Sequence, residues 1–168
     1  MPINFLKNAP KVLSSYSAVL TTPIGKVGLV LADASLTEID FLPPSFPAIA
    51  PLSSLAGEIA EQLNAYFTTS DFTFSLPLAP HGTPFQRRVW SALLGIDAGQ
   101  TQTYGRLAAE LKSSARAVGG GCRANPIPIV IPCHRVVASA GLGGFMGQRV
   151  GESFEMKRWL LAHEKVQF

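Results

Sequence analysis

The sequence predicts an α/β fold of the α+β kind, in which a small antiparallel sheet with a helix precedes a mostly helical half. Short stretches that alternate apolar and polar side chains lie before residue 43, whereas apolar residues spaced three and four apart prevail after residue 83. A stretch rich in proline and glycine, residues 77–84, separates the two patterns. At 168 residues, the chain can bury a core as one ordinary domain or two small ones.

Three strands are predicted near the N-terminus. Residues 16–22 and 27–32 are rich in apolar and β-branched side chains, and the intervening Pro-Ile-Gly-Lys has turn-forming chemistry. Residues 35–42 alternate apolar with polar side chains, which predicts a third strand. Together these segments favour an antiparallel meander.

A helix and a further short strand are predicted next. Ser53 or Ser54 is a suitable N-cap, because a serine hydroxyl accepts a hydrogen bond from a free amide at a helix start. Apolar residues then recur at steps of four: Leu55, Ile59, Leu63 and Phe67. Phe72 and Phe74 alternate with polar neighbours, which predicts the short strand.

The formal charge changes sign across the proline- and glycine-rich stretch, where we expect a domain boundary at about residue 80. Residues 1–80 hold three Lys and six Asp or Glu, a balance of −3, and residues 81–168 hold eleven Lys or Arg and five Asp or Glu, a balance of +6. A basic half indicates a polyanionic partner such as nucleic acid, although an uneven solvated surface explains the same charges.

The second half begins with a strong helix signal. Thr83 followed by Pro84 is typical of a capped helix start, and three apolar residues would face inward: Phe85, Val89 and Leu93. Thr103 is predicted to cap a second helix, and Ser113-Ser114 forms a short turn before a third helical segment near Ala115. Two helices joined by a tight turn, with basic residues around them, indicate a helix-turn-helix.

A last helix is expected over about residues 154–164. Its apolar and aromatic side chains would share one side: Met156, Trp159, Leu160 and His163.

Three consecutive glycines, residues 119–121, fall within the third helical segment. Each costs about 1 kcal/mol relative to alanine in a helix interior, so the segment is either a loop or a helix that needs a bare surface. A bare surface would let a nucleic-acid backbone approach closely. Arg116 and Arg123 lie seven residues apart and would point the same way on a helix.

Residues 125–137, Asn-Pro-Ile-Pro-Ile-Val-Ile-Pro-Cys-His-Arg-Val-Val, place Cys133 at the end of a short apolar strand framed by prolines. A cysteine in an apolar run is commonly a buried core residue. The adjacent His134 favours a nucleophile instead, because a neighbouring imidazole can accept the thiol proton. Consecutive residues on a strand point to opposite faces, so direct contact between the two side chains is not assured, and a bridging water is one way to join them.

The composition excludes several classes of protein. With 47% hydrophobic and 15% charged residues, the chain is not of the disordered kind. Two cysteines are too few for a disulfide scaffold or an all-cysteine zinc site. No apolar run is long enough for a membrane span, and the start of the chain lacks the pattern of a signal peptide. We therefore expect a cytoplasmic protein (nuclear in a eukaryote) in a reducing setting.

Taken together, these motifs resemble the O6-alkylguanine-DNA alkyltransferases. The segment from Asn125 to Val136 is similar to that family's active-site signature, whose core is Pro-Cys-His-Arg-Val. Three more motifs agree in order, namely residues 103–105 with the start of the helix-turn-helix, residues 115–120 with the recognition helix and residues 159–164 with the closing helix. The likeness covers residues 83–164 apart from an insertion at 148–153, whereas the first half is similar only in its strand and helix outline.

The resemblance implies a ribonuclease H-like outline for a structural domain over residues 1–80. Residues 81–168 would form a winged-helix-like domain that binds DNA and carries out alkyl transfer. It implies direct reversal of DNA alkylation damage by a monomer, without cofactor or metal. The acceptor would take the alkyl group irreversibly from O6 of guanine, or from O4 of thymine, in a single turnover.

Four catalytic roles follow from the resemblance. Cys133 would accept the alkyl group, because the thiolate is the competent nucleophile and an unassisted thiol is mostly protonated at neutral pH. His134 would take the thiol proton through a water, and Glu164 would orient and polarise His134. Asn125 would brace the turn that positions the site.

DNA contacts are implied in the same way. The damaged base would be flipped out of the duplex, because O6 cannot meet a protein thiol while stacked. Arg116 would fill the vacated stack, Tyr104 would crowd the neighbouring phosphate, and the glycine-rich helix would lie in the minor groove. Four residues occupy positions similar to the family's other backbone contacts: Gln86, Ser113, Arg123 and Ser139.

Four residues would line the substrate pocket: Cys122, Val136, Phe145 and Met146. Cys122 stands where a larger apolar residue is common, Phe145 lacks the hydroxyl of a frequent tyrosine, and Met146 replaces a small residue of some relatives. The first half has no cysteine, so we expect none of the structural zinc that some relatives bind.

Three other functions account for part of these features. A lesion-binding module that flags alkylated bases without repairing them would lack the cysteine, which is present here. A winged-helix regulator could use Cys133 as an alkylation or redox sensor, although the acidic half offers no second DNA reader. A cysteine hydrolase would need an oxyanion-hole motif, and none is evident.

Overall fold

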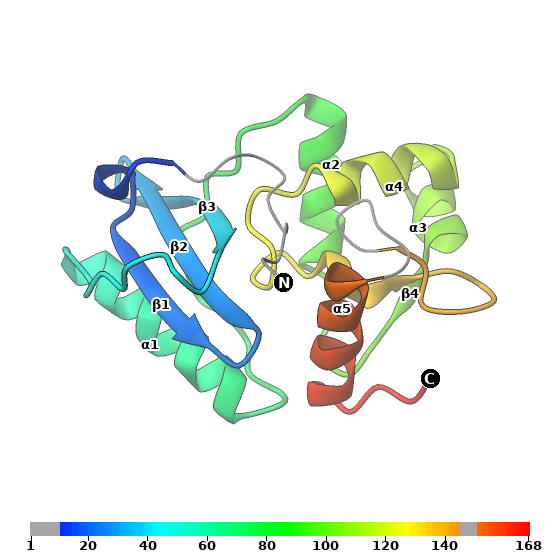
Figure 1. Cartoon of the computed structure of the whole chain (residues 1–168). Coiled ribbons are helices and arrows are strands. Elements are labelled where there is room, and N and C mark those ends of the chain that lie inside the picture. The colour runs from blue at the N-terminus through cyan, green and yellow to red at the C-terminus, as the bar shows by residue number, and fades with distance from the viewer. Residues whose placement is uncertain (1–10, 145–150) are drawn as a thin grey trace. The chain divides into compact units, whose positions relative to one another are not determined.

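A computed structural model describes residues 11–144 and 151–168 of the chain (Figure 1). The chain divides into two compact units, Met1–Pro80 and His81–Phe168. Among the described residues, no helix is long and apolar enough to cross a bilayer.

The N-terminal unit contains the predicted antiparallel meander. A 3₁₀ turn, η1 (Leu13–Ser15), leads into β1 (Ala18–Thr22), β2 (Gly25–Ala32) and β3 (Ser35–Leu42), which pair in that order. The helix α1 (Ser54–Thr68) packs beside β1 (Figure 1). The sheet-and-helix prediction is therefore confirmed.

Ser53 caps α1, and its hydroxyl accepts a hydrogen bond from the Ala56 amide at 3.1 Å. The buried face differs in part from the predicted one, because a step of four residues drifts around a helix with 3.6 residues per turn. Leu55 and Phe67 are only half-buried. The fully buried positions of α1 are Ala56, Ile59, Leu63 and Tyr66.

The strand predicted around Phe72 and Phe74 is wrong. The backbone of neighbouring Ser75 bonds to a side chain rather than to a strand, since the Gln62 amide accepts from its N–H at 2.9 Å and donates to its carbonyl at 3.0 Å. The Phe74 ring packs 5.4 Å from that of Tyr66 instead. Alternating aromatic residues here cover α1 and do not extend the sheet.

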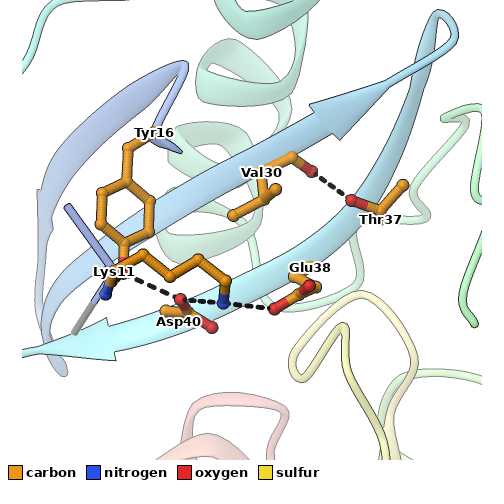
Figure 2. Close-up of polar contacts among 6 residues, drawn as sticks. All are labelled: Lys11, Tyr16, Val30, Thr37, Glu38 and Asp40. Atoms are coloured by element: carbon orange, nitrogen blue, oxygen red, sulfur yellow. Dashed lines mark hydrogen bonds and ion pairs between the residues drawn. The ribbon is translucent and has the colours of Figure 1, made fainter. Parts of the chain in front are cut away.

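A polar cluster ties the segment before β1 to β3 (Figure 2). Lys11 Nζ donates to Glu38 Oε2 at 2.6 Å and to Asp40 Oδ2 at 2.9 Å, and the Tyr16 hydroxyl donates to the same Asp40 oxygen at 2.8 Å. Burial and the bond to Asp40 raise the pKa of Tyr16 to about 12, which keeps it a neutral donor. Gly28 makes room for the Tyr16 ring, because a Cβ at that position would lie 2.6 Å from it.

The C-terminal unit is mostly helical. Its helices are α2 (Pro84–Leu93), α3 (Tyr104–Glu110), α4 (Ala115–Arg123) and α5 (Glu152–His163). Two very short strands, β4 (Gln102–Thr103) and β5 (Val136–Val137), pair in parallel. Because β4 leads directly into α3 and β5 follows the Cys133 segment, this pairing joins the helix-turn-helix to that segment.

The predicted helix starts of this unit are confirmed. Thr83 and Gln86 form a reciprocal capping box ahead of α2, with Pro84 at its first position. Thr103 accepts from the Arg106 amide at 3.2 Å, and Ser114 accepts from the Ala117 amide at 3.1 Å.

Two predictions about packing in this unit need correction. In α2, Val89 and Leu93 are buried as expected, but Phe85 is half-buried. In α5, Trp159 and His163 are half-buried and stack on each other with ring centroids 5.0 Å apart. The face of α5 that is fully buried is instead formed by Ser153, Met156, Lys157, Leu160 and Leu161.

Candidate active site

The segment before Cys133 is a compact turn and not the predicted strand. The Ile131 amide donates to the Ile127 carbonyl at 2.9 Å, and Ile129 has a φ of 75°. That left-handed conformation is strained for a β-branched residue, and it persists only where the surroundings hold it. The prolines therefore frame a fold-back of the chain.

Asn125 spans both ends of this turn. Its Nδ2 donates to the Ile131 carbonyl at 2.8 Å, and its Oδ1 accepts from the Ile127 amide at 3.0 Å. The residue is buried, with 2% of its surface exposed. Asn125 is thus placed to hold the backbone that leads to Cys133.

Cys133 begins η2 (Cys133–Arg135), a single 3₁₀ turn that packs against α5. Neither of the chain's two cysteines is in a disulfide, and Cys133 is 6% exposed. Because Cys133 and His134 lie in a helical turn, the expectation that strand geometry sends them to opposite faces does not apply here. Burial in apolar surroundings disfavours a thiolate, so a reactive sulfur at this place needs help from nearby groups.

His134 is fully buried and bonded to Glu164, with 2.8 Å between Nε2 and Oε1. Hydrogen bonds from His134 and Arg135 hold the pKa of Glu164 far below its usual range, although its desolvation acts the other way. The ionised carboxylate requires the imidazole proton on Nε2. Nδ1 is then an acceptor, and this buried atom has no hydrogen-bond partner within the described part of the chain.

Desolvation lowers the pKa of His134, and Glu164 opposes that shift only in part. The imidazole is therefore neutral at physiological pH. A neutral imidazole with its Nδ1 lone pair unused has the properties of a general base.

Arg135 completes the ionic part of the site, a role that sequence reasoning missed. Its Nε donates to Glu164 Oε2 at 2.9 Å and its Nη2 to Oε1 at 2.8 Å, and Nη1 donates to the Ile96 carbonyl. This fork fixes the carboxylate that holds His134. The available signal was a permanently charged residue inside an apolar segment.

Lys157 is the second residue that was missed. It is 0% exposed, and its Nζ donates to the carbonyls of Val136 at 2.6 Å and Gly144 at 3.0 Å. Burial lowers the pKa of Lys157 to about 8, although Cys133 and Cys122 favour its charged form. The signal was a lysine three and four residues before Leu160 and Leu161, at a core position of α5.

The helix-turn-helix consists of α3 and α4, which pack against each other. Arg116 and Arg123 are both exposed, on the first and last turns of α4, and Ser113 is exposed in the turn before it. Tyr104, the first residue of α3, donates its hydroxyl to the Gly144 carbonyl at 3.3 Å. Ser139 is exposed in the turn after β5.

Gln86 has a structural task in addition to its predicted DNA contact. Its Oε1 accepts from the Thr83 amide at 2.9 Å in the capping box of α2.

Of the four predicted pocket residues, Cys122 and Val136 are buried. Phe145 and Met146, like residues 148–150 of the insertion, lie outside the described residues.

The three-glycine segment is helical, which decides between the two alternatives of the sequence analysis. Gly121 packs on α2, where a Cβ would lie 2.9 Å from Val89 Cγ2, and its carbonyl accepts from Trp90 Nε1 at 2.9 Å. Gly119 and Gly120 have open space at the Cβ position. One glycine thus permits helix packing, and the other two leave a bare face on α4.

Because Gly121 is packed and Gly120 is open at the Cβ position, alanine is expected to have opposite effects on stability at the two positions. Gly121→Ala should lower the free energy of unfolding by about 1–3 kcal/mol, because Val89 must shift. Gly120→Ala should raise it by up to about 1 kcal/mol through helix propensity. Thermal unfolding of both variants measures this, and a Gly121→Ala protein as stable as the Gly120→Ala protein would contradict the packing role.

Comparisons with known proteins identify relatives of this chain. A family model described as "6-O-methylguanine DNA methyltransferase, DNA binding domain" matches residues 84–166. Over 158 residues, the chain is 37% identical to a methylated-DNA–protein-cysteine methyltransferase of Methanosarcina barkeri, covering 89% of this chain and 97% of that relative.

Solved structures are similar as well. The chain is 36% identical to the O6-methylguanine methyltransferase of Mycobacterium tuberculosis, with a TM-score of 0.75 and coverage of 88% of this chain and 90% of that one. It is also similar to a Mycobacterium tuberculosis structure in complex with DNA, at 36% identity and a TM-score of 0.72, covering 88% of this chain and 91% of that one.

Proposed function

The chain belongs to the methylated-DNA–protein-cysteine methyltransferase family, and from this premise we propose that Cys133 is the cysteine that accepts the alkyl group. The protein is an O6-methylguanine DNA methyltransferase, which repairs DNA by alkyl transfer to a cysteine. The observation that carries the assignment is the buried His134, held by Glu164 through Nε2 with Nδ1 left as an acceptor directly after Cys133.

The proposed reaction uses this arrangement in one displacement. A water bound to Nδ1 of His134 relays the thiol proton of Cys133 to the imidazole, and Glu164 stabilises the resulting imidazolium. The thiolate attacks the methyl carbon, the S–C bond forms, and the C–O6 bond breaks with its electron pair leaving on guanine. The imidazolium proton returns through solvent to guanine, so the net reaction converts a thiol and O6-methylguanine into a methyl thioether and guanine.

The stable thioether makes the reaction stoichiometric. No group in the proposed mechanism removes the methyl from sulfur, so each chain acts once. General-base assistance of this kind contributes about 10²–10⁴-fold to a rate.

DNA engagement is proposed to run through α3 and α4. The bare Gly119–Gly120 face would allow α4 to approach a minor-groove backbone closely, with the exposed Arg116 able to occupy the stack vacated by a flipped base. Tyr104, Ser113, Arg123, Gln86 and Ser139 would contact the backbone around it. A monomer with residues 1–80 as a structural domain is sufficient for this scheme.

The test is the intact mass of the protein after incubation with a duplex that contains one O6-methylguanine. We expect a single added methyl per chain, which does not increase with excess DNA, and no addition to Cys133→Ala. Trypsin separates the two cysteines, because cleavage after Arg116, Arg123 and Arg135 puts Cys122 in residues 117–123 and Cys133 in residues 124–135. A methyl on residues 117–123 would overturn the assignment, and an unchanged mass with retained DNA binding would favour the lesion-binding module.

A further inference from the structure

Three exposed cations lie around the turn between α3 and α4. Arg88 of α2 reaches that turn, because its Nη2 donates to the Leu111 carbonyl at 2.9 Å. Its guanidinium thus lies beside the peptide bond that joins Leu111 to Lys112. Arg116 follows four residues after Lys112, on the first turn of α4, and all three basic residues are exposed. Arg88 and Lys112, the turn cations, have no role in the scheme described so far.

Little negative charge opposes these cations along the chain. Residues 83–124 hold six Lys or Arg and two Asp or Glu, a balance of +4. Of the two carboxylates, that of Glu110 is already engaged, since its Oε1 accepts from Gln102 Nε2 at 2.7 Å and lies 3.7 Å from Arg106 Nε. Asp97 belongs to the connection that follows α2. Cations concentrated at one turn repel each other, so this surface favours a polyanion.

Lys112 occupies a backbone position that favours glycine. Its φ is 53°, and its amide donates to the Ala109 carbonyl at 3.2 Å. The next amide, that of Ser113, donates to the Ala108 carbonyl at 2.9 Å, which completes a Schellman motif at the end of α3. A residue with a Cβ is strained in this left-handed conformation, whereas glycine is not. Stability alone therefore favours glycine at residue 112, and a task of its charged side chain explains the lysine.

The bond from Arg88 to Leu111 has a structural role, because a guanidinium at a helix C-terminus satisfies a free carbonyl and is favoured by the helix dipole. This role uses one of the five N–H donors of the side chain, and the planar fork can bind a phosphate with others. The bond also fixes the guanidinium at the turn. Less side-chain entropy is then lost when an anion binds.

We propose that Arg88 and Lys112 bind backbone phosphates of the DNA that α4 engages. This inference rests on the proposed engagement of DNA by α3 and α4, to which it adds two phosphate contacts. Phosphate contacts fix the register of a protein on the duplex and carry no sequence information. The turn cations therefore hold α4 against DNA whether or not an alkylated base is present.

The test measures how binding to an unmethylated duplex depends on salt. Each neutralised phosphate contributes about 0.9 to the slope of log K against log salt concentration. We expect Arg88→Gln and Lys112→Gly each to lower the magnitude of that slope by about 0.9 and to weaken binding by about tenfold at 0.1 M salt. Both losses should be equal on a duplex that contains O6-methylguanine, because the contacts are not to bases. Methyl transfer at subsaturating duplex should slow by the same factor.

Lys112→Gly separates phosphate binding from a structural role, because stability and binding should change in opposite directions. The glycine relieves the left-handed strain, so the thermal midpoint should stay the same or rise by up to about 4 °C while DNA binding weakens. Arg88→Lys keeps the charge and should keep most of the wild-type slope.

The matched control is Arg158→Gln, which removes one positive charge from the same unit at an α5 side chain that is 52% exposed. It should leave the slope and the affinity unchanged. A wild-type slope in either Arg88→Gln or Lys112→Gly would overturn the proposal, since both turn cations are needed for the two added contacts.

Failure of this inference and failure of the proposed acceptor give different results. Binding to an unmethylated duplex involves no transfer of a methyl group. Lowered slopes in a protein that takes up no methyl on Cys133 would support the turn cations and refute the proposed acceptor. Methyl uptake on Cys133 with slopes that the two substitutions leave unchanged would do the reverse.

Discussion

Replacing Glu164 by glutamine is expected to slow methyl transfer to Cys133 by about 10²–10⁴-fold, the range that general-base catalysis supplies. The neutral amide no longer fixes the imidazole proton on Nε2 or stabilises the imidazolium. It also leaves the Arg135 guanidinium buried without its counter-charge. Removing one partner of a buried ion pair costs about 3–5 kcal/mol of unfolding free energy, so this variant should also be less stable.

The transfer rate of Glu164→Gln is measured by intact mass at a temperature where circular dichroism shows the variant to be folded. Glu155→Gln is the control, because Glu155 lies on the same helix with its side chain 66% exposed and 3.9 Å from Arg158. An exposed pair of this kind contributes at most about 1 kcal/mol, and its loss should not affect transfer. A folded Glu164→Gln protein that transfers at the wild-type rate would remove Glu164 from the mechanism.

The same variant should change the dependence of stability on pH. The pKa of Glu164 is lower in the folded protein than its ordinary value of 4.5, so this group stabilises the fold above that pH. The contribution is lost as pH falls, because the unfolded chain takes up the proton first. Urea unfolding between pH 3 and pH 7 should therefore show a smaller loss of stability on acidification for Glu164→Gln than for the wild type.

Local chemistry allowed much of the fold to be predicted. Proline and glycine turns delimit the strands, and β3 has the predicted bounds of residues 35–42. Caps such as Thr83, Thr103 and Ser114 act within three residues of themselves, so a single sequence displays both partners of each hydrogen bond. These signals require no knowledge of the rest of the structure.

The predictions that were wrong or missing depend on contacts between distant residues. The turn over residues 127–131 looks like a strand because isoleucine and valine favour strands, but Asn125 and the prolines impose a fold-back. Arg135 and Glu164 are 29 residues apart, and their fork exists only because η2 packs on α5. Lys157 was missed because a single charged residue at an apolar position of a helix is ordinarily taken as an exception to the pattern. In the structure it is buried and donates to two backbone carbonyls.

Asn125→Ala is expected to lower the free energy of unfolding by about 2–4 kcal/mol and to slow methyl transfer by about tenfold to a hundredfold. Two buried hydrogen bonds are lost, which leaves the Ile127 amide and the Ile131 carbonyl without these partners. The strained Ile129 then keeps its burial and the bond between Ile131 and Ile127, but loses the brace across the turn. Relaxation of this turn would move Cys133, and a displacement of about 1 Å at a reacting atom can cost a hundredfold in rate.

Stability and positioning can be separated in this variant. Urea unfolding measures the first, and the methyl-transfer rate under conditions where the variant is fully folded measures the second. Asn64→Ala, at an exposed site of α1, is the control and should change the unfolding free energy by no more than about 0.5 kcal/mol. If Asn125→Ala loses stability but the folded protein transfers methyl at the wild-type rate, Asn125 stabilises the unit without positioning the sulfur, because the η2 turn must then be held in place by its contacts with α5 and α2.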